Sequence, residues 1–321
     1  MSGIRLVRKK GENMRLITRS DFDGLVCGVL LVDVGIADSY EFVHPRDVVD
    51  GKVSVTENDV LANIPFVPGC GLWFDHHISE WERLKLSKEF NYKGKSELAP
   101  SCARVIYNYY GGQEKFARFD SSGLMDAVDR SDSGQLTVED IKNPTDWMLL
   151  SFIMDPRTGL GRYKDYRISN YRLMEYMIEY CRTKKSDEIL AEADVRERVD
   201  RYFYYERDFE HMLKSNAVVN GNVVVINLLN VKEVLPGNRF KEFVLFPEQN
   251  VSVRIIWGHN KQNIVITCGA NIISRTAKTD IGKMLLNYGG GGHPSVGSCQ
   301  VAIDSWEQAR DKIVAQLKAD G

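Results

Sequence analysis

The sequence has no long apolar run, no closely spaced cysteine pair and no marked excess of charge. No stretch approaches the roughly 18–20 consecutive apolar residues that a membrane-spanning helix requires. The basic N-terminal segment is not followed by an apolar core, so it does not resemble a secretory signal. The six cysteines are scattered, which argues against a disulfide scaffold and against a zinc ribbon. We therefore expect a cytoplasmic protein with reduced thiols and no membrane partner.

The charge balance is nearly even, with 42 Lys and Arg residues, 44 Asp and Glu residues and a net charge of −2. This balance argues against a protein that coats long duplex DNA. It leaves room for an enzyme that takes a short anionic substrate. The content of 43% hydrophobic and 27% charged residues is typical of a globular protein, and 321 residues suit two domains of ordinary size.

Short β-leaning segments alternate with helical segments in the first half of the chain. Strands are expected at residues 15–20, 40–44, 53–56 and 71–74. This alternation predicts an α/β fold whose mostly parallel sheet carries helices on both faces. The N-terminal domain is expected to span residues 1–190. A helical linker would follow at 191–215, and a smaller mixed α/β domain at 216–321, where strands are separated by Asn-Gly and Gly-His-Asn turns.

Acidic residues and histidines follow the ends of these apolar segments at four places. The members are Asp21 with Asp23, Asp59, Asp75 with His76 and His77, and Asp129 with Asp132. Parallel strand ends converge on one edge of a sheet, where several carboxylates would repel one another without a cation. Oxygen ligands with an imidazole suit Mn²⁺ or Mg²⁺. One or two ions are expected, although an isolated DxDG motif is more often a turn or a helix cap.

Taken together, these motifs resemble a known enzyme family. SDFDG at 20–24, ND at 58–59, FDHHISE at 74–80 and AVDRSD at 127–132 resemble the successive motifs of DHH phosphoesterases. That family includes the exonuclease RecJ, nano-RNases, cyclic dinucleotide phosphodiesterases and manganese pyrophosphatases. GGGGHPSVGSCQV at 289–301 resembles the signature of the DHH-associated domain, and DPRTGLGRY and GNRF resemble the exopolyphosphatase-like branch. The resemblance spans nearly the whole chain.

The resemblance implies a metal-binding set and supporting residues. The implied metal ligands are Asp21 and Asp59 for a first ion, and Asp23, Asp59, His76 and Asp129 for a second. Asp75 would orient His76, Asp132 would support the ligands without touching metal, and His77 would face the substrate phosphate. The expected catalytic residues are Asp59, His76, His77 and Arg19.

Arg19 departs from the family pattern, because many members carry a histidine ligand just before the first acidic pair. Arginine stays protonated and cannot ligate a metal. Either Asp21, Asp59 and water hold the first ion more weakly, or Arg19 supplies a fixed positive charge in its place. We hypothesise one firmly held metal; a degenerate site that binds without cleaving is a third reading.

The C-terminal half is expected to bind a phosphate group of the substrate. Four consecutive glycines at 289–292 let a backbone approach a ligand closely, although glycine runs are often only hinges. Arg275 is either a bidentate phosphate ligand or a partner in a surface salt bridge. The predicted substrate-binding residues are Arg275, Gly290, Gly291, Gly292, His293, Arg239 and Arg157.

The expected function is hydrolysis of a short phosphodiester or phosphoanhydride by a metal-activated water in a cleft between two domains. Candidate substrates are short single-stranded oligonucleotides, cyclic dinucleotides, a nucleoside bisphosphate and polyphosphate. The alternative is a nucleotide sensor with a degenerate site and no turnover. The sequence leaves the oligomeric state open, including a homodimer.

Overall fold

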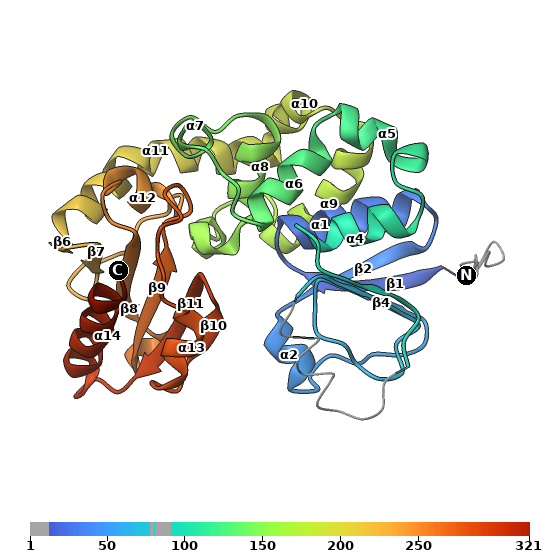
Figure 1. Ribbon diagram of the computed structural model, residues 1–321. Helices are drawn as coiled ribbons and strands as arrows, with labels where there is room; N and C mark the ends of the chain where they lie inside the picture. Colours follow the sequence, from blue (N-terminus) through green and yellow to red (C-terminus); the bar gives the residue numbers. More distant parts are fainter. Residues whose placement is uncertain (1–12, 78–79, 81–90) are drawn as a thin grey trace. The chain divides into compact units, whose positions relative to one another are not determined.

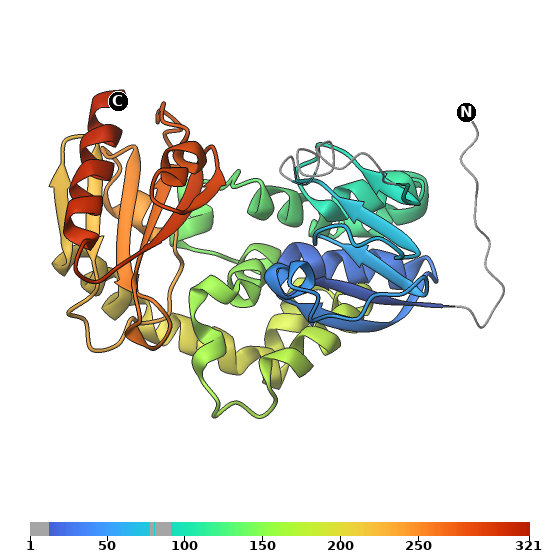
Figure 2. The same ribbon diagram turned by 90° about the horizontal axis from the view of Figure 1, so that it is seen from below.

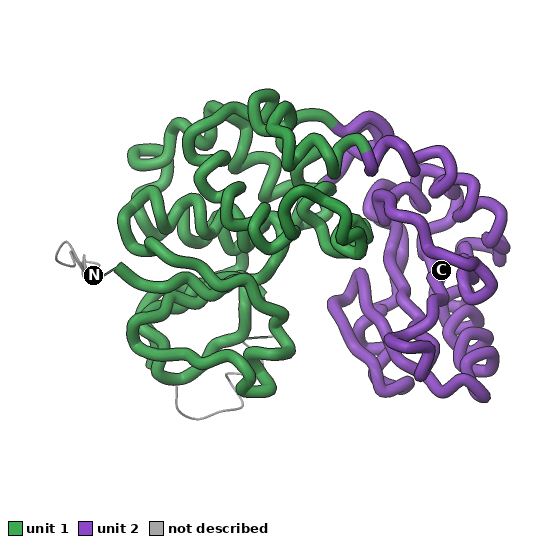
Figure 3. Tube along the Cα trace, turned by 180° about the vertical axis from the view of Figure 1, so that it is seen from behind, with its two compact units in different colours: residues 1–135, 145–200 green, residues 136–144, 201–321 purple. Residues whose placement is uncertain are grey.

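The computed structural model describes residues 13–77, 80 and 91–321, so Ile78 and Ser79 of the FDHHISE motif lie outside the described residues. The chain forms two compact units, residues 1–135 with 145–200 and residues 136–144 with 201–321 (Figure 3). The division at residue 200 falls inside helix α11 (Ala193–Ser215). Residues 136–144, which the sequence placed in the N-terminal domain, group with the second unit.

The first unit is built on a five-stranded sheet in which every strand pair is parallel (Figure 1). The strand order is β2-β1-β3-β4-β5. The strands are β1 (Met14–Arg19), β2 (Ala37–Val43), β3 (Asp59–Ala62), β4 (Leu72–Asp75) and β5 (Gly94–Ser96). The parallel α/β sheet expected from the sequence is confirmed.

Helices α4 (Cys102–Tyr109) and α9 (Asn170–Thr183) both pack against α1 (Phe22–Asp33) beside this sheet. A Cβ atom on Gly28 of α1 would lie 2.9 Å from Ile178 Cδ1, so the glycine lets α1 and α9 approach closely. A separate apolar cluster that includes Ile17, Leu61 and Trp73 packs with Val48 of α2 (Pro45–Val49). The sheet is therefore covered by apolar side chains from helices and loops.

The remaining helices of the first unit are α5 (Gln113–Ser121), α6 (Leu124–Asp132), α8 (Asp146–Met154), the 3₁₀ turns η1 (Pro156–Thr158) and η2 (Leu160–Arg162), and α10 (Ser186–Ala191). Nearly all of helix α8 is buried, from Trp147 to Met154. It packs against α6 and α10, so it forms the apolar centre of the helical part of this unit.

The prediction of a strand at residues 53–56 is wrong, because strand β3 begins six residues later, at Asp59. Val53 and Val55 alternate with polar residues, but they pack over the face of the sheet instead of joining it. The Asp59 carboxylate accepts hydrogen bonds from the Thr56 backbone N–H (2.6 Å) and hydroxyl (2.9 Å). These bonds hold residues 56–59 in a turn that leads into the strand.

The second unit carries a six-stranded mixed sheet in the order β10-β11-β9-β8-β7-β6. Only the β7–β8 pair is parallel among the strand pairs of its described residues. The strands are β6 (Ala217–Asn220), β7 (Val223–Asn227), β8 (Val251–Trp257), β9 (Ile264–Ala270), β10 (Gly291–His293) and β11 (Val296–Val301).

Helices cover both faces of this second sheet, and side chains of β7 alternate between them. Val223 and Val225 pack with Ile313 of α14 (Trp306–Asp320), the dark red helix of Figure 2. Val224 and Ile226 pack on the other face, with apolar residues of α11. The further elements of this unit are α7 (Val138–Lys142), α12 (Lys241–Leu245), η3 (His259–Lys261) and α13 (Ile281–Leu286). Among the described residues, no helix combines the length and apolar character needed to cross a membrane.

Candidate metal centre

Asp23 lies in the first turn of α1, directly beyond the carboxyl end of β1. Its carboxylate accepts hydrogen bonds from the backbone N–H groups of Cys102 (2.9 Å) and Ala103 (2.8 Å) at the start of α4. Gly24 makes this turn possible, since a Cβ atom there would lie only 2.0 Å from the Arg19 carbonyl oxygen. The glycine of the SDFDG motif thus brings the Asp23 carboxylate against the amino end of a second helix.

His76 follows β4 and offers a free ring nitrogen to the same place. Its Nδ1 lies 3.1 Å from the Ala99 carbonyl oxygen, so Nδ1 carries the proton in the neutral ring. The opposite nitrogen, Nε2, is buried and has no hydrogen-bond donor or acceptor assigned to it among the described residues. A buried polar atom without a partner is unusual in a folded protein and calls for a missing ligand.

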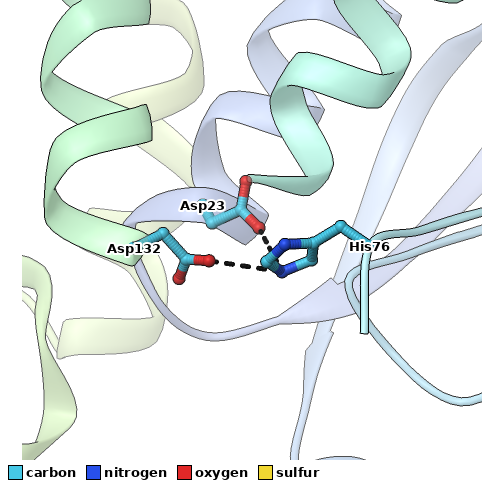
Figure 4. Close-up of side chains that lie close together, drawn as sticks. All are labelled: Asp23, His76 and Asp132. Carbon is cyan, nitrogen blue, oxygen red and sulfur yellow. Dashed lines mark ion pairs between the residues drawn. The ribbon is translucent and has the colours of Figure 1, made fainter. Parts of the chain in front are cut away.

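Asp132, the last residue of α6, completes a group of three (Figure 4). His76 Nε2 lies 3.2 Å from Asp132 Oδ2 and 3.7 Å from Asp23 Oδ2. One ligand atom from each of the three residues lies within 4.8 Å of the other two. The Nε2 atom of His76 therefore faces two carboxylates.

The electrostatics of the group favour a cation. Burial raises the pKa of Asp23 to about 7, and the negative charge of Asp21 adds to the effect. Loss of hydration around the carboxylate also raises the pKa of Asp132 to about 7, with a further contribution from Asp23, although the residue keeps part of its surface exposed. A bound divalent ion would lower both pKa values again, because it stabilises the ionised carboxylates. Two carboxylate oxygens with one imidazole nitrogen fit Mn²⁺ or Mg²⁺.

Asp21 lies beside this group, but its oxygen atoms are engaged elsewhere. Oδ1 accepts hydrogen bonds from the backbone N–H of Gly24 (3.0 Å) and from Asn63 Nδ2 (3.1 Å). Oδ2 lies 2.9 Å from Arg19 Nε. Asn63 directly follows β3 and has a φ of 57°. Sequence reasoning missed it, although a polar residue at the end of a buried strand was the signal used for the other sites.

Asp132, and not Asp129, lies beside Asp23 and His76. Asp129 Oδ1 accepts a hydrogen bond from Ser101 Oγ (2.7 Å), and its Oδ2 accepts one from Arg104 Nε (2.8 Å). Asp132 instead joins Asp23 and His76. The structure therefore favours Asp132 over Asp129 as the candidate ligand, contrary to the expectation from the sequence, and the assignment of the metal ligands stays a prediction. Ser101 and Arg104 lie on or next to α4, with no sequence motif to mark them.

Asp75 orients His77 and not His76. The Asp75 Oδ1 atom lies 2.9 Å from His77 Nδ1, whereas the Nδ1 of His76 faces a backbone carbonyl. Burial lowers the pKa of His77, but the hydrogen bond and charge of Asp75 outweigh it and raise the pKa to about 9. His77 is thus a cation at neutral pH, and its ring centroid lies 4.3 Å from that of His76.

Asp59 stands at the opposite edge of the sheet, so its expected roles as bridging ligand and catalytic residue are corrected. It is the first residue of β3, and a four-residue strand spans on the order of 10 Å. Its Oδ1 accepts a 2.7 Å hydrogen bond from Arg15 Nε. In a parallel sheet, Asp59 therefore lies at the amino edge while Asp21 and Asp23 follow the carboxyl edge.

Arg157 is the predicted substrate-binding residue that lies near the cluster in the first unit. Its backbone N–H and its Nε both donate to Asp155 Oδ1, at 2.9 Å and 2.7 Å. Burial lowers the pKa of the Arg157 side chain, but Asp155, with help from Asp21 and Asp132, raises it overall. The Arg157 side chain is about half exposed, and its charge interacts with those of Asp21 and Asp132.

The other predicted phosphate-binding residues lie in the second unit. Gly291, Gly292 and His293 form β10, and Gly290 precedes it. A Cβ atom on Gly290 would lie 2.3 Å from the Ser298 carbonyl oxygen, so close packing of β10 and β11 already requires this glycine. Arg275 has a φ of 52° in the loop before α13. The Arg239 guanidinium stacks on Phe240, 3.9 Å from its ring centre. Substrate contact by these residues stays a prediction.

Comparison with solved structures identifies the family. The chain matches the pGpG-specific phosphodiesterase PggH of Vibrio cholerae with 42% sequence identity, over 96% of this chain and 100% of that chain, at a TM-score of 0.81. This chain belongs to the DHH phosphoesterase family. It is a phosphohydrolase, and the sensor reading without turnover is set aside.

Weaker structural matches accompany this one. RecJ of Thermus thermophilus in complex with Mn²⁺ matches at 13% identity and a TM-score of 0.49, over 96% of this chain and 52% of that chain. Another exonuclease RecJ bound to manganese matches at 13% identity and a TM-score of 0.46, over 95% of this chain and 90% of that chain. No protein-family model and no curated protein sequence matches.

Proposed function

We propose that this DHH phosphoesterase hydrolyses the phosphodiester of a short linear dinucleotide with a 5′-phosphate, of the pGpG type. The observation that carries the metal-dependent chemistry is the buried, unpartnered Nε2 of His76, which faces Asp23 and Asp132. The substrate class is supported by PggH, which is described as pGpG-specific and is 42% identical to this chain over its full length.

Asp23, His76 and Asp132 would hold a divalent ion, Mn²⁺ or Mg²⁺. Such an ion activates water near neutral pH and stabilises the charge that develops on a phosphoryl group. The Ala99 carbonyl fixes the tautomer of His76, and the N–H groups at the start of α4 fix the Asp23 carboxylate. These contacts hold the ligand atoms of His76 and Asp23 in place before any substrate binds.

Two cationic side chains would bind the phosphate group of the substrate. His77 is held by Asp75 and carries a positive charge at neutral pH, so it can donate a hydrogen bond to a phosphoryl oxygen. Arg157 is anchored through its Nε to Asp155 and is placed near the carboxylate cluster. Arg275 and His293 of the second unit remain the predicted contacts for the rest of the substrate.

A substrate panel tests the proposal. Purified protein with Mn²⁺ is incubated with pGpG, pApA, a cyclic dinucleotide, 3′-phosphoadenosine 5′-phosphate and polyphosphate, and products are separated by chromatography. We expect pGpG to be cleaved with the highest kcat/KM, and Asp132→Asn to abolish cleavage. Rapid hydrolysis of polyphosphate or of the cyclic dinucleotide, with pGpG left intact, would refute the proposed substrate class.

A further inference from the structure

The carboxylate of Asp21 is closed to a metal ion although it borders the metal-binding group. Its Oδ1 accepts from Gly24 N and Asn63 Nδ2, and its Oδ2 is paired with Arg19 Nε at 2.9 Å. Asp21 is 7% exposed, so these bonds are largely shielded from water. A divalent ion on Oδ2 would have to displace a charge-assisted hydrogen bond from a permanently charged guanidinium.

The other carboxylates of the first unit's motifs are engaged as well. Asp59 is bound by Arg15 at the opposite edge of the sheet. Asp75 is bound by His77, and Asp129 by Arg104. Within the part of the chain that the structure describes, Asp23, His76 and Asp132 are the single group of His, Cys, Asp or Glu side chains placed to share an ion.

An independent observation separates this group from an ordinary acidic cluster. The His76 side chain is nine-tenths buried, and its Nε2 points at both carboxylates without a hydrogen-bond partner. The three side chains can therefore hold one ion, and the motif carboxylates that the structure describes leave none nearby to hold a second.

We propose that the centre binds one divalent ion per chain and that Arg19 takes the place of a second cation. Arg19 neutralises Asp21 and keeps it out of the coordination sphere. The Arg19 side chain is 35% exposed and meets Asp21 through Nε, so its outer Nη atoms can bind a phosphoryl oxygen of the substrate. The proposal rests on the proposed function in taking a divalent ion as the ligand of Asp23, His76 and Asp132.

Metal binding without substrate tests the proposal. Full-length protein is stripped of metal with a chelator, then titrated with Mn²⁺ by calorimetry and by electron paramagnetic resonance of the free ion. We expect one tightly bound Mn²⁺ per chain and no spin-coupled pair. Two ions bound with similar affinity would refute the proposed role of Arg19 but would still support a metal centre at Asp23, His76 and Asp132. No bound ion would overturn the metal centre itself, and with it the proposed function.

A pair of matched variants isolates Arg19. Arg19→Gln removes the positive charge but keeps an amide donor, so the negative charge of Asp21 is no longer neutralised beside the site. We expect Mn²⁺ affinity to rise on the order of tenfold, or a second ion to bind. Arg19→Lys keeps the charge and should retain one ion with nearly unchanged affinity. Arg15→Gln is the matched control at the other end of β1. Unchanged stoichiometry and affinity in Arg19→Gln, with all variants folded by circular dichroism, would contradict the proposal.

Discussion

Strand β1 carries the same kind of ion pair at both of its ends, and the two pairs have opposite surroundings. At the amino end, Arg15 Nε contacts Asp59 at 2.7 Å, and Arg15 also contacts Glu41. At the carboxyl end, Arg19 Nε contacts Asp21 at 2.9 Å. The two arginines are almost equally exposed, at 36% and 35%.

The difference lies in what surrounds each pair. The Asp59 carboxylate accepts hydrogen bonds from Arg15 and Thr56, and these bonds offset the free-energy cost of burying its charge. Beyond Arg19 and Asp21, the carboxylates of Asp23 and Asp132 face the Nε2 atom of His76, and burial raises the pKa of Asp23 to about 7. An acidic residue near a strand end therefore says little alone. The two carboxylates with raised pKa values at the carboxyl edge mark the candidate functional site.

The largest expected effect separates Asp132 from Asp129, three residues apart on α6. Asp132→Asn removes a ligand oxygen, so Mn²⁺ affinity and kcat should each fall by more than the roughly 10–100-fold typical of supporting residues. Asp129→Asn is the control, because Asp129 is bound by Ser101 and Arg104 and its replacement should cost clearly less than that of Asp132. Calorimetry and steady-state kinetics measure both. The reverse ranking would restore Asp129 as the ligand.

A smaller effect is expected at Asp75, which orients His77. Asp75→Asn removes the charge that keeps His77 protonated, and kcat should fall by about 10–100-fold while Mn²⁺ affinity changes little. Metal binding measured on the same preparation serves as the control for folding. A loss of metal binding equal to that of His76→Ala would instead place Asp75 in the coordination sphere.

At the amino end of β1, the expected effect is on stability and not on catalysis. Asp59→Asn should leave kcat nearly unchanged from wild type. The free energy of unfolding should drop by about 1–2 kcal/mol, a value reduced because Arg15 is more than a third exposed and screened by solvent. Denaturant titration measures the stability. A kcat reduced as strongly as in Asp132→Asn would show that Asp59 belongs to the catalytic site.

The smallest predicted effect is the pH dependence of that stability. Burial raises the pKa of Asp59, but the hydrogen bonds from Arg15 and Thr56 outweigh it and lower the pKa overall. A lowered pKa stabilises the fold above the ordinary carboxyl pKa of about 3.9, and the contribution disappears as the pH falls through the folded value. The stability gap between wild type and Asp59→Asn should therefore close as the pH drops from about 6 to below about 3. A gap that widens on acidification would contradict this.

The parallel sheet and the placement of Asp23 and His76 beyond its carboxyl edge follow from the sequence, because buried strands ending in polar residues are a local signal. The choice between Asp129 and Asp132 does not follow. Both lie on one side of a helix, and their partners, such as Arg104, come from a different helix, α4. Local patterns carry no information on which carboxylate a distant arginine will bind.

The locality of sequence patterns also explains the wrong strand at residues 53–56 and the wrong partner predicted for Asp75. Val53 and Val55 alternate with polar residues as a strand would, yet they cover the sheet as part of a loop. Asp59 was therefore placed after a strand that does not exist there. The pairing of Asp75 with His77 instead of His76 depends on how the backbone turns after β4, which adjacent histidines in a sequence cannot indicate.

The three residues of the metal centre come from α1, from the segment after β4 and from α6, which are separated by many residues along the chain. An ion held by all three would tie these elements together like a removable cross-link. The melting temperature should therefore report occupancy: at a Mn²⁺ concentration of about 100 times the dissociation constant, binding adds roughly 2.7 kcal/mol to the free energy of unfolding. A simple melting curve would thus tell a metal-loaded preparation from a stripped one.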